Sequence, residues 1–196
     1  RWEFGRAKFV LILAIGLALL SRNLTAPFTG LHEWNSAMYA TFARNHVEYG
    51  LGYTKLFCTW GDTAAPPEPP QRYLNHPPLI ALWAAVPAWI FGDEEWVFRS
   101  VPIAATLGSA WLLMEMMSRL RSRRRALLTG LFYVTWPGVA FFGRMLDHVA
   151  LVQFFSLLML DGYLRWAGDY AGEPERGRGA IRFTLGAALG VATGWA

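Results

Sequence analysis

The feature that most constrains this chain is a series of apolar blocks, with most of the basic residues gathered in the segments between or before them. Apolar runs occupy residues 9–20, 79–91, 101–117, 126–142 and 149–166, and another begins near Ile181. Only 16% of the residues are charged, whereas soluble domains carry about 25%. A net charge of +4 also suits nucleic-acid binding, but here the basic residues lie between the apolar blocks. We therefore predict an all-α, polytopic transmembrane helical bundle that contacts membrane lipids and no nucleic acid.

The lengths and charges of the blocks predict one topology. A membrane span needs about 20 residues, so the short run 79–91, which contains Pro87, is expected to be interfacial or re-entrant. The spans are then expected at 5–21, 100–118, 126–142, 149–165 and from 181 onward. This brings the N-terminus, the 119–125 cluster and segment 165–182 to one side, with three, five and four basic residues, together 12 of the 18 Lys and Arg. The positive-inside rule makes that side cytoplasmic and residues 21–99 an outer loop.

Both ends of the sequence bear on whether the chain is part of a longer protein. The first residue is Arg1, and the last residues stop inside an apolar run, so we expect a fragment of a longer protein. The first apolar block also leaves an alternative open, because a basic start, a short apolar core and small residues near Ala26 suit a signal peptide.

The outer loop is predicted to contain a helix that lies on the membrane surface. Leu31, Trp34, Met38, Phe42 and Tyr49 fall on one helical face. The glycines at positions 50 and 52 are expected to end this helix. The Pro-rich segment 61–70 is expected to be a loop with little regular structure. The short run 79–91 provides a second juxtamembrane element.

Three polar groups share the predicted outer face. They are His32-Glu33-Trp34-Asn35, Asn75-His76-Pro77-Pro78 and the turn Gly143-Arg144-Met145-Leu146-Asp147-His148. Polar residues at a membrane boundary are commonly just solvated. Asp147, however, lies between two apolar blocks, where a carboxylate needs a partner or a task. Arg144 is its local partner if the group has no function. On the cytoplasmic side, Glu115 is expected to pair with Arg119, and Asp161 with Arg165.

The order of these motifs resembles the GT-C superfamily of membrane glycosyltransferases, in the branch of protein mannosyltransferases and lipid A aminoarabinose transferases. The shared pattern is one span, then a loop with an acidic residue that opens a juxtamembrane helix, then a basic-Pro-Pro motif and a short amphipathic segment. A stretch like Phe91-Gly92-Asp93-Glu94-Glu95-Trp96-Val97-Phe98-Arg99, a basic turn and an Arg...Asp turn follow. The resemblance covers nearly the whole chain, so residues 1–196 are expected to be the N-terminal part of such a catalytic module.

The resemblance implies roles for individual residues. The family's first-loop motif is usually Asp-Glu and here reads His32-Glu33, so the catalytic base is assigned to Glu33. Asp147 matches the second-loop aspartate that helps to form the sugar site. His76 stands at the basic position that helps to hold the lipid phosphate, with Arg44 and Arg144 as further candidates. His32, Asn35 and His148 are the remaining substrate-binding candidates. No cofactor is implied with certainty; a divalent metal is left open, although Asn75 replaces an acidic residue that some relatives link to one.

The implied reaction is a direct, inverting transfer at the outer face of a membrane, expected to be the bacterial cytoplasmic membrane. The donor is a polyprenyl-phosphate sugar, and the acceptor is a lipid, a glycan or a protein. Two other classes remain open, a transporter or flippase for a lipid-linked sugar and a non-catalytic scaffold. Transporters carry polar residues within their spans near the bilayer midplane, whereas the polar groups here gather in the outer loops.

Overall fold

The computed structural model describes residues 3–61, 65–170 and 175–194. Over these residues the elements are α1 (Glu3–Leu20), α2 (Glu33–Glu48), α3 (Leu51–Thr54), β1 (Cys58–Thr59), β2 (Arg72–Tyr73), α4 (Leu79–Phe91), α5 (Glu95–Leu120), α6 (Arg123–Thr135), α7 (Pro137–Phe142), α8 (His148–Ala167) and α9 (Arg176–Thr193). The two short strands pair antiparallel, Cys58 opposite Tyr73. The all-α prediction is confirmed for this part of the chain, while Arg1, residues 62–64 of the predicted loop and the final residues 195–196 lie outside it.

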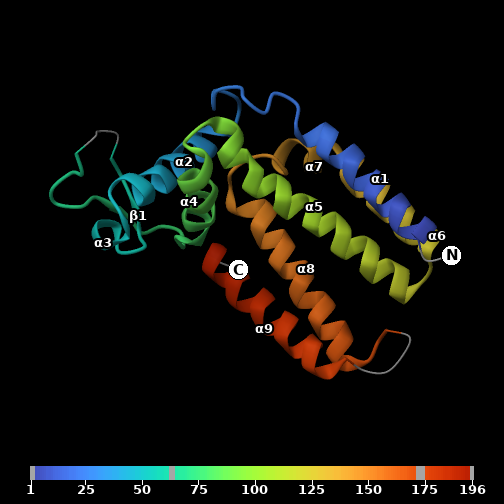
Figure 1. Ribbon diagram of the computed structural model, residues 1–196. Helices are drawn as coiled ribbons and strands as arrows, with labels where there is room; N and C mark the ends of the chain where they lie inside the picture. The colour runs from blue at the N-terminus through green and yellow to red at the C-terminus, as the bar shows by residue number, and fades with distance from the viewer. Residues whose placement is uncertain (1–2, 62–64, 171–174, 195–196) are drawn as a thin grey trace.

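Helix α5 lies between two helix pairs, α1 with α6 on one side and α8 with α9 on the other (Figure 1). Two helices, α5 and α8, are long and apolar enough to cross a membrane. At 1.5 Å per residue they measure about 39 Å and about 30 Å, against a hydrocarbon core of about 30 Å. The apolar part of α1, Ala7–Leu20, and all of α4 are shorter.

The predicted span 126–142 is two helices rather than one. Helix α6 ends at Thr135, and α7 begins at Pro137. Proline forces the residue before it toward an extended conformation, and Trp136 accordingly has φ −63° and ψ 125°. Proline at the first helical position then starts α7 favourably, because its missing N–H has no partner there in any helix. One continuous helix over 126–142 was predicted, and the break before Pro137 was not.

Helices α2 and α4 pack together beside the end of α5 and α8 (Figure 1). Their shared core contains Met38, Phe42, Ile80 and Ala84, all buried. The predicted face of α2 is therefore only half right, because Leu31 and Trp34 are 76% and 64% exposed. The outer side of α4 is apolar and exposed, and it consists of Trp83, Val86, Trp89, Ile90 and Phe91.

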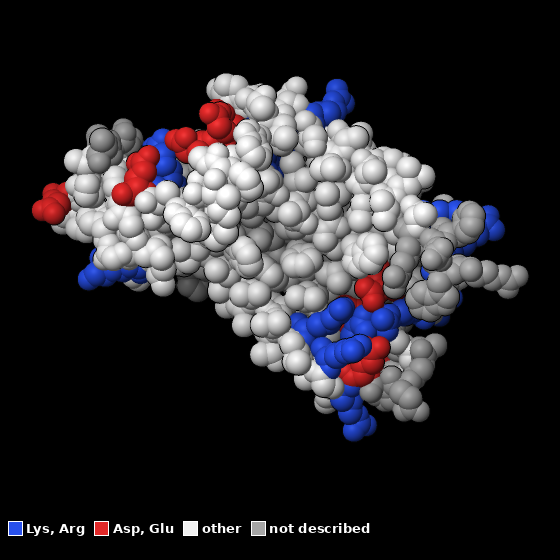
Figure 2. Space-filling view, in the orientation of Figure 1, with Lys and Arg blue, Asp and Glu red and all other residues white. Residues whose placement is uncertain are grey.

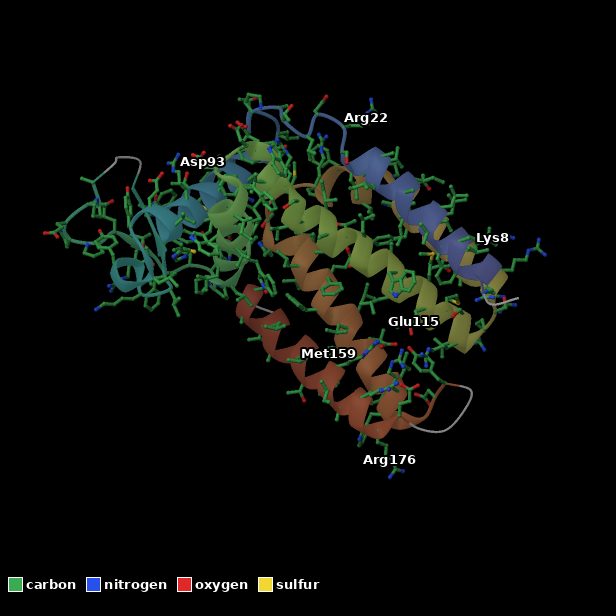
Figure 3. All side chains as sticks on the ribbon, viewed as in Figure 1. Lys8, Arg22, Asp93, Glu115, Met159 and Arg176 are labelled. Atoms are coloured by element: carbon green, nitrogen blue, oxygen red, sulfur yellow. The ribbon has the colours of Figure 1, made fainter. Side chains whose placement is uncertain are left out.

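The ends of the bundle differ in charge. We call the end formed by the last turns of α5 and α8 and the first turns of α6 and α9 the basic end, and the opposite end the loop end. Lys8, Glu115 and Arg176 lie at the basic end, whereas Arg22 and Asp93 lie at the loop end (Figure 3). Blue and red atoms gather at the basic end, and a broad uncharged surface separates them from the loop end (Figure 2).

An ion-pair network joins three helices at the basic end. Arg119 lies 3.0 Å from Glu115, and Arg165 lies 2.8 Å from Asp161, which confirms both predicted local pairs. Arg165 also reaches Glu115 at 2.9 Å and Glu175 at 2.6 Å, and Arg182 pairs with Asp161. Because Asp161 and Arg165 are buried, these contacts satisfy charges that would otherwise be costly.

Candidate functional site

The first turn of α2 is bound to the turn between α7 and α8. Asn35 Nδ2 donates to Asp147 Oδ2 at 3.1 Å, and the next residue, Ser36, accepts from the backbone N–H of Leu146 at 3.1 Å. From the other side, Thr106 Oγ1 of α5 donates to the carbonyl of Gly143 at 2.9 Å. Two helices therefore fix a turn that lies more than 100 residues from α2 in the sequence.

Four of the predicted site residues meet at this point, and we call Asn35, His76, Asp147 and His148 the polar cluster. Asp147 Oδ1 caps α8 by accepting from the N–H of His148 at 2.6 Å. The same oxygen lies 2.5 Å from His148 Nδ1. His148 stacks on His76, with ring centroids 5.6 Å apart and an interplanar angle of 18°. The side chain of Asp147 is 16% exposed and that of His148 is 40% exposed, so the cluster is reachable from solvent.

The stacked histidines end a ladder of aromatic rings. His76 contacts Tyr73 at 5.9 Å, and Tyr73 stacks on the buried Phe42 of α2 at 5.5 Å. Trp60 contacts both Phe42 and Tyr73. The ladder anchors His76, which stands in a loop, to the core beneath α2, and so fixes the position of its ring.

A cavity of about 500 Å³ adjoins the polar cluster. Its wall is mostly apolar, and it is lined by Thr106, Trp136, Gly138, Val139, Phe142, Gly143, His148, Val149, Ala150, Val152 and Gln153. His148 is the member of the cluster that lines it. Apolar cavities with a few convergent polar groups are the usual form of ligand sites.

Burial and the negative charge of Asp147 both affect the pKa of the neighbouring Tyr39 side chain. Burial raises the pKa of Tyr39 far above its usual value, and the negative charge of Asp147 raises it further. Tyr39 therefore keeps its proton at any physiological pH. Its side chain is buried in the core of α2 and α4, where it forms part of the surroundings of the carboxylate.

Glu33, the predicted base, has a different environment. Its Oε1 accepts from Arg99 Nη2 at 3.3 Å, and both side chains are at most 7% exposed. Arg99 also donates to the carbonyls of Leu24 and Ala26, at 3.0 and 2.5 Å, and lies over the ring of Phe28. Glu33 Oε2 has no partner among the described residues. The carboxylate thus helps to hold the 24–28 loop and the start of α2 against α5.

The remaining candidates lie at different distances from the polar cluster. His32 precedes α2 with φ 63°, an uncommon conformation for a residue other than glycine, and its ring lies 6.1 Å from Phe142 at the cavity. Arg144 donates to the carbonyl of Arg22, which ties the turn to the first loop. Arg44 pairs with Glu48 and lies about 14 Å along α2 from Asn35. The structure therefore does not bring Arg44 to the cluster.

Among residues 3–61, 65–170 and 175–194, no three His, Cys, Asp or Glu side chains are arranged to hold a metal ion. The lone Cys58 is buried in β1, and burial raises the pKa of its thiol to about 12. The raised pKa keeps the thiol protonated at neutral pH, which disfavours reactions that need the thiolate.

Sequence reasoning missed the parts of the site that depend on long-range contacts. Arg99 was noted only as part of a motif, although a buried arginine at the start of an apolar helix requires an acidic partner. That requirement was the available signal. Ser36 and Tyr73 carried none, because an isolated serine in a helix or an isolated tyrosine in a loop indicates no particular partner.

Comparison with known families adds one finding. A family model described as "Dolichyl-phosphate-mannose-protein mannosyltransferase" matches residues 75–192, which are 118 of the 196 residues. No curated protein and no solved structure shows significant similarity to the chain. The matched segment contains three members of the polar cluster, His76, Asp147 and His148, together with Arg99 and Arg144.

Proposed function

Because the chain belongs to the dolichyl-phosphate-mannose-protein mannosyltransferase family, and is thus a membrane glycosyltransferase that uses a lipid-linked sugar, we propose that it transfers the sugar of a polyprenyl phosphate to an acceptor hydroxyl with inversion. The polar cluster and the adjoining cavity are the proposed site. The carrying observation is that Asp147 starts the apolar helix α8 and is held there by Asn35 of α2, 112 residues away.

The chemistry needs three functions from the protein. A carboxylate oxygen with a free lone pair can accept a sugar hydroxyl, and Asp147 Oδ2 uses only one of its two lone pairs on Asn35. A cation or a hydrogen-bond donor can stabilise the phosphate as its negative charge develops, which is the role proposed for Arg144 and, as a donor, for His76. Glu33 as the base remains a prediction, since one of its oxygens is bound to Arg99.

The proposed site faces the outside of a multi-span protein, in the bacterial cytoplasmic membrane. Two observations support this assignment. The basic end carries the 119–125 arginines, which the positive-inside rule assigns to the cytoplasm, and the polar cluster lies at the loop end. The exposed apolar side of α4 suits an interfacial helix, since Trp residues favour the headgroup region. An assay must identify the sugar and decide whether the acceptor is a lipid, a glycan or a protein.

A transfer assay tests the function. The full-length protein in nanodiscs is given polyprenyl-phosphate mannose and a membrane extract as acceptor source. Asp147→Asn should lower the turnover number at least about 100-fold, because it weakens the positioning of the sugar. His76→Ala should raise KM for the donor more than His76→Lys. Asp93→Asn, an exposed carboxylate at the same end, is the matched control. Wild-type turnover indistinguishable from empty nanodiscs, across sugar donors, contradicts the proposal.

Topology is tested by labelling single cysteines with a membrane-impermeant maleimide in intact cells. Glu68→Cys and Asp93→Cys should react from outside, and Ser122→Cys only after the cells are opened. All three positions are exposed, whereas the native Cys58 is buried with a raised pKa and should stay silent. Protection of Asp93→Cys in intact cells, with Glu68→Cys labelled, would show that α4 crosses the membrane.

A further inference from the structure

We infer that His148 is the general base of the transfer reaction and that Asp147 orients it. This inference rests on the proposed function and identifies the proton acceptor within the same site. No feature of the sequence pattern pointed to this role, because His148 was a substrate-binding candidate only and the base was assigned to Glu33.

The first support is the orientation of the imidazole. His148 Nδ1 is buried and lies 2.5 Å from Asp147 Oδ1, a close ion-pair contact that does not have the geometry of a hydrogen bond. A carboxylate beside one ring nitrogen favours the tautomer with the proton on that nitrogen, which leaves the other nitrogen as an acceptor. Nε2 is not among the buried unpartnered atoms and has no hydrogen bond with any described residue. The free lone pair is therefore available to a substrate.

The second support is position. The side chain of His148 is 40% exposed and lines the 500 Å³ cavity together with Phe142 and Gly143. The Glu33 carboxylate, in contrast, is 7% exposed and bound to Arg99. A base must come within about 3 Å of the proton that it removes. An acceptor hydroxyl in the cavity lies beside His148, whereas Glu33 is buried behind the loop that Arg99 holds.

The third support is the restraint on the ring. His148 stacks on His76, which is itself held by Tyr73 and the aromatic ladder. The titratable groups around His148 are Asp147, His76 and, beside Asp147, the buried Tyr39. Thr106 of α5 and Gly194 at the end of α9 also adjoin this region and carry no charge. Asp147 is therefore the one anion facing the ring among the described residues, and it stabilises the imidazolium once the ring takes a proton.

The step balances without any added reagent. The acceptor oxygen forms a bond with the anomeric carbon as its proton moves to His148 Nε2. The bond between the anomeric carbon and the phosphate oxygen breaks, and its electron pair leaves with the polyprenyl phosphate. The proton on His148 returns to water or to the released phosphate.

The test compares His148→Gln and His148→Ala with wild type, each in the full-length protein in nanodiscs with polyprenyl-phosphate mannose. His148→Gln should lower the turnover number by about 100-fold or more, with KM for the donor changed less than threefold. Added imidazole should restore part of the activity of His148→Ala. Asp147→Asn should shift the acid limb of the kcat/KM profile, which a purely structural role does not do. The matched control is His46→Gln, which replaces a buried histidine bound to Thr54. The turnover of all variants is compared per folded molecule.

The outcomes separate the two proposals. If the wild type is active and His148→Gln keeps more than a third of its turnover number, the base assignment is overturned and the proposed function stays intact. A second set of results also overturns the base assignment. In that set His148→Gln is inactive, imidazole does not rescue His148→Ala, and Asp147→Asn leaves the acid limb of the kcat/KM profile unshifted. Wild type that transfers no sugar from any polyprenyl-phosphate donor overturns the proposed function itself.

Discussion

Removing either partner of the Glu33–Arg99 pair should destabilise the protein by about 3–5 kcal/mol, because the remaining charge stays buried without a partner. Both side chains are at most 7% exposed and lie 3.3 Å apart. Arg99→Met also releases the carbonyls of Leu24 and Ala26, so it should cost more than Glu33→Leu. Thermal unfolding in nanodiscs measures both effects. Glu94→Gln, an exposed carboxylate on the same segment, should change stability by no more than about 0.5 kcal/mol.

The double variant decides what Glu33 does. Glu33→Leu combined with Arg99→Met leaves no buried charge, so its loss of stability should be smaller than the sum of the single losses. If the pair only anchors the start of α2, activity per folded molecule should recover in the double variant to within about tenfold of wild type. If Glu33 is the base, the double variant should be as inactive as Glu33→Leu alone. That second result would return the base to the residue that the family resemblance implied.

The elements that could be predicted from sequence are those specified by local pattern. Helices α5 and α8 follow from long, mostly apolar runs, and the pairs Glu115–Arg119 and Asp161–Arg165 follow from a spacing of four residues. The break before Pro137 was visible in the sequence, but the apolar length was given more weight than the proline. The exposure of Trp34 could not be predicted, because helical periodicity does not indicate which part of an apolar face a neighbouring helix covers.

The sequence predicted that the site residues lie on the same side of the membrane, but not which of them contact one another. Topology brought Asn35, His76 and Asp147 to one end of the bundle, and the structure joins them through Asn35–Asp147 and His76–His148. The predicted topology could not distinguish the environment of Glu33 from that of Asp147, because the environment of Glu33 depends on Arg99, 66 residues away. Asn35 and Glu33 are two residues apart on α2, and such neighbours do not point the same way from a helix. Asn35 therefore contacts Asp147, while Glu33 contacts Arg99 instead.

Replacing Gly179 by alanine should destabilise the α8–α9 pair by about 1–3 kcal/mol, whereas the same change at Gly177 should be neutral or stabilising by up to about 1 kcal/mol. A Cβ on Gly179 would lie 2.5 Å from the backbone nitrogen of Trp166 and 2.8 Å from the carbonyl of Gly162. Both contacts are with backbone atoms, so no side chain can turn aside and the helices must separate. A Cβ on Gly177 meets nothing within 4 Å. Thermal unfolding of the two variants measures the difference.

The same pair of variants connects helix packing with the site. Helix α9 ends beside the polar cluster, since a Cβ on Gly194 would lie 3.6 Å from His148 Cδ2. Movement of α9 away from α8 at Gly179 also pulls Arg182 from Asp161 at the basic end. Gly179→Ala should therefore reduce turnover as well as stability, and Gly177→Ala should reduce neither. Equal stability and equal turnover in the two variants would show that α8 and α9 are not packed backbone against backbone, and that the position of His148 does not depend on α9.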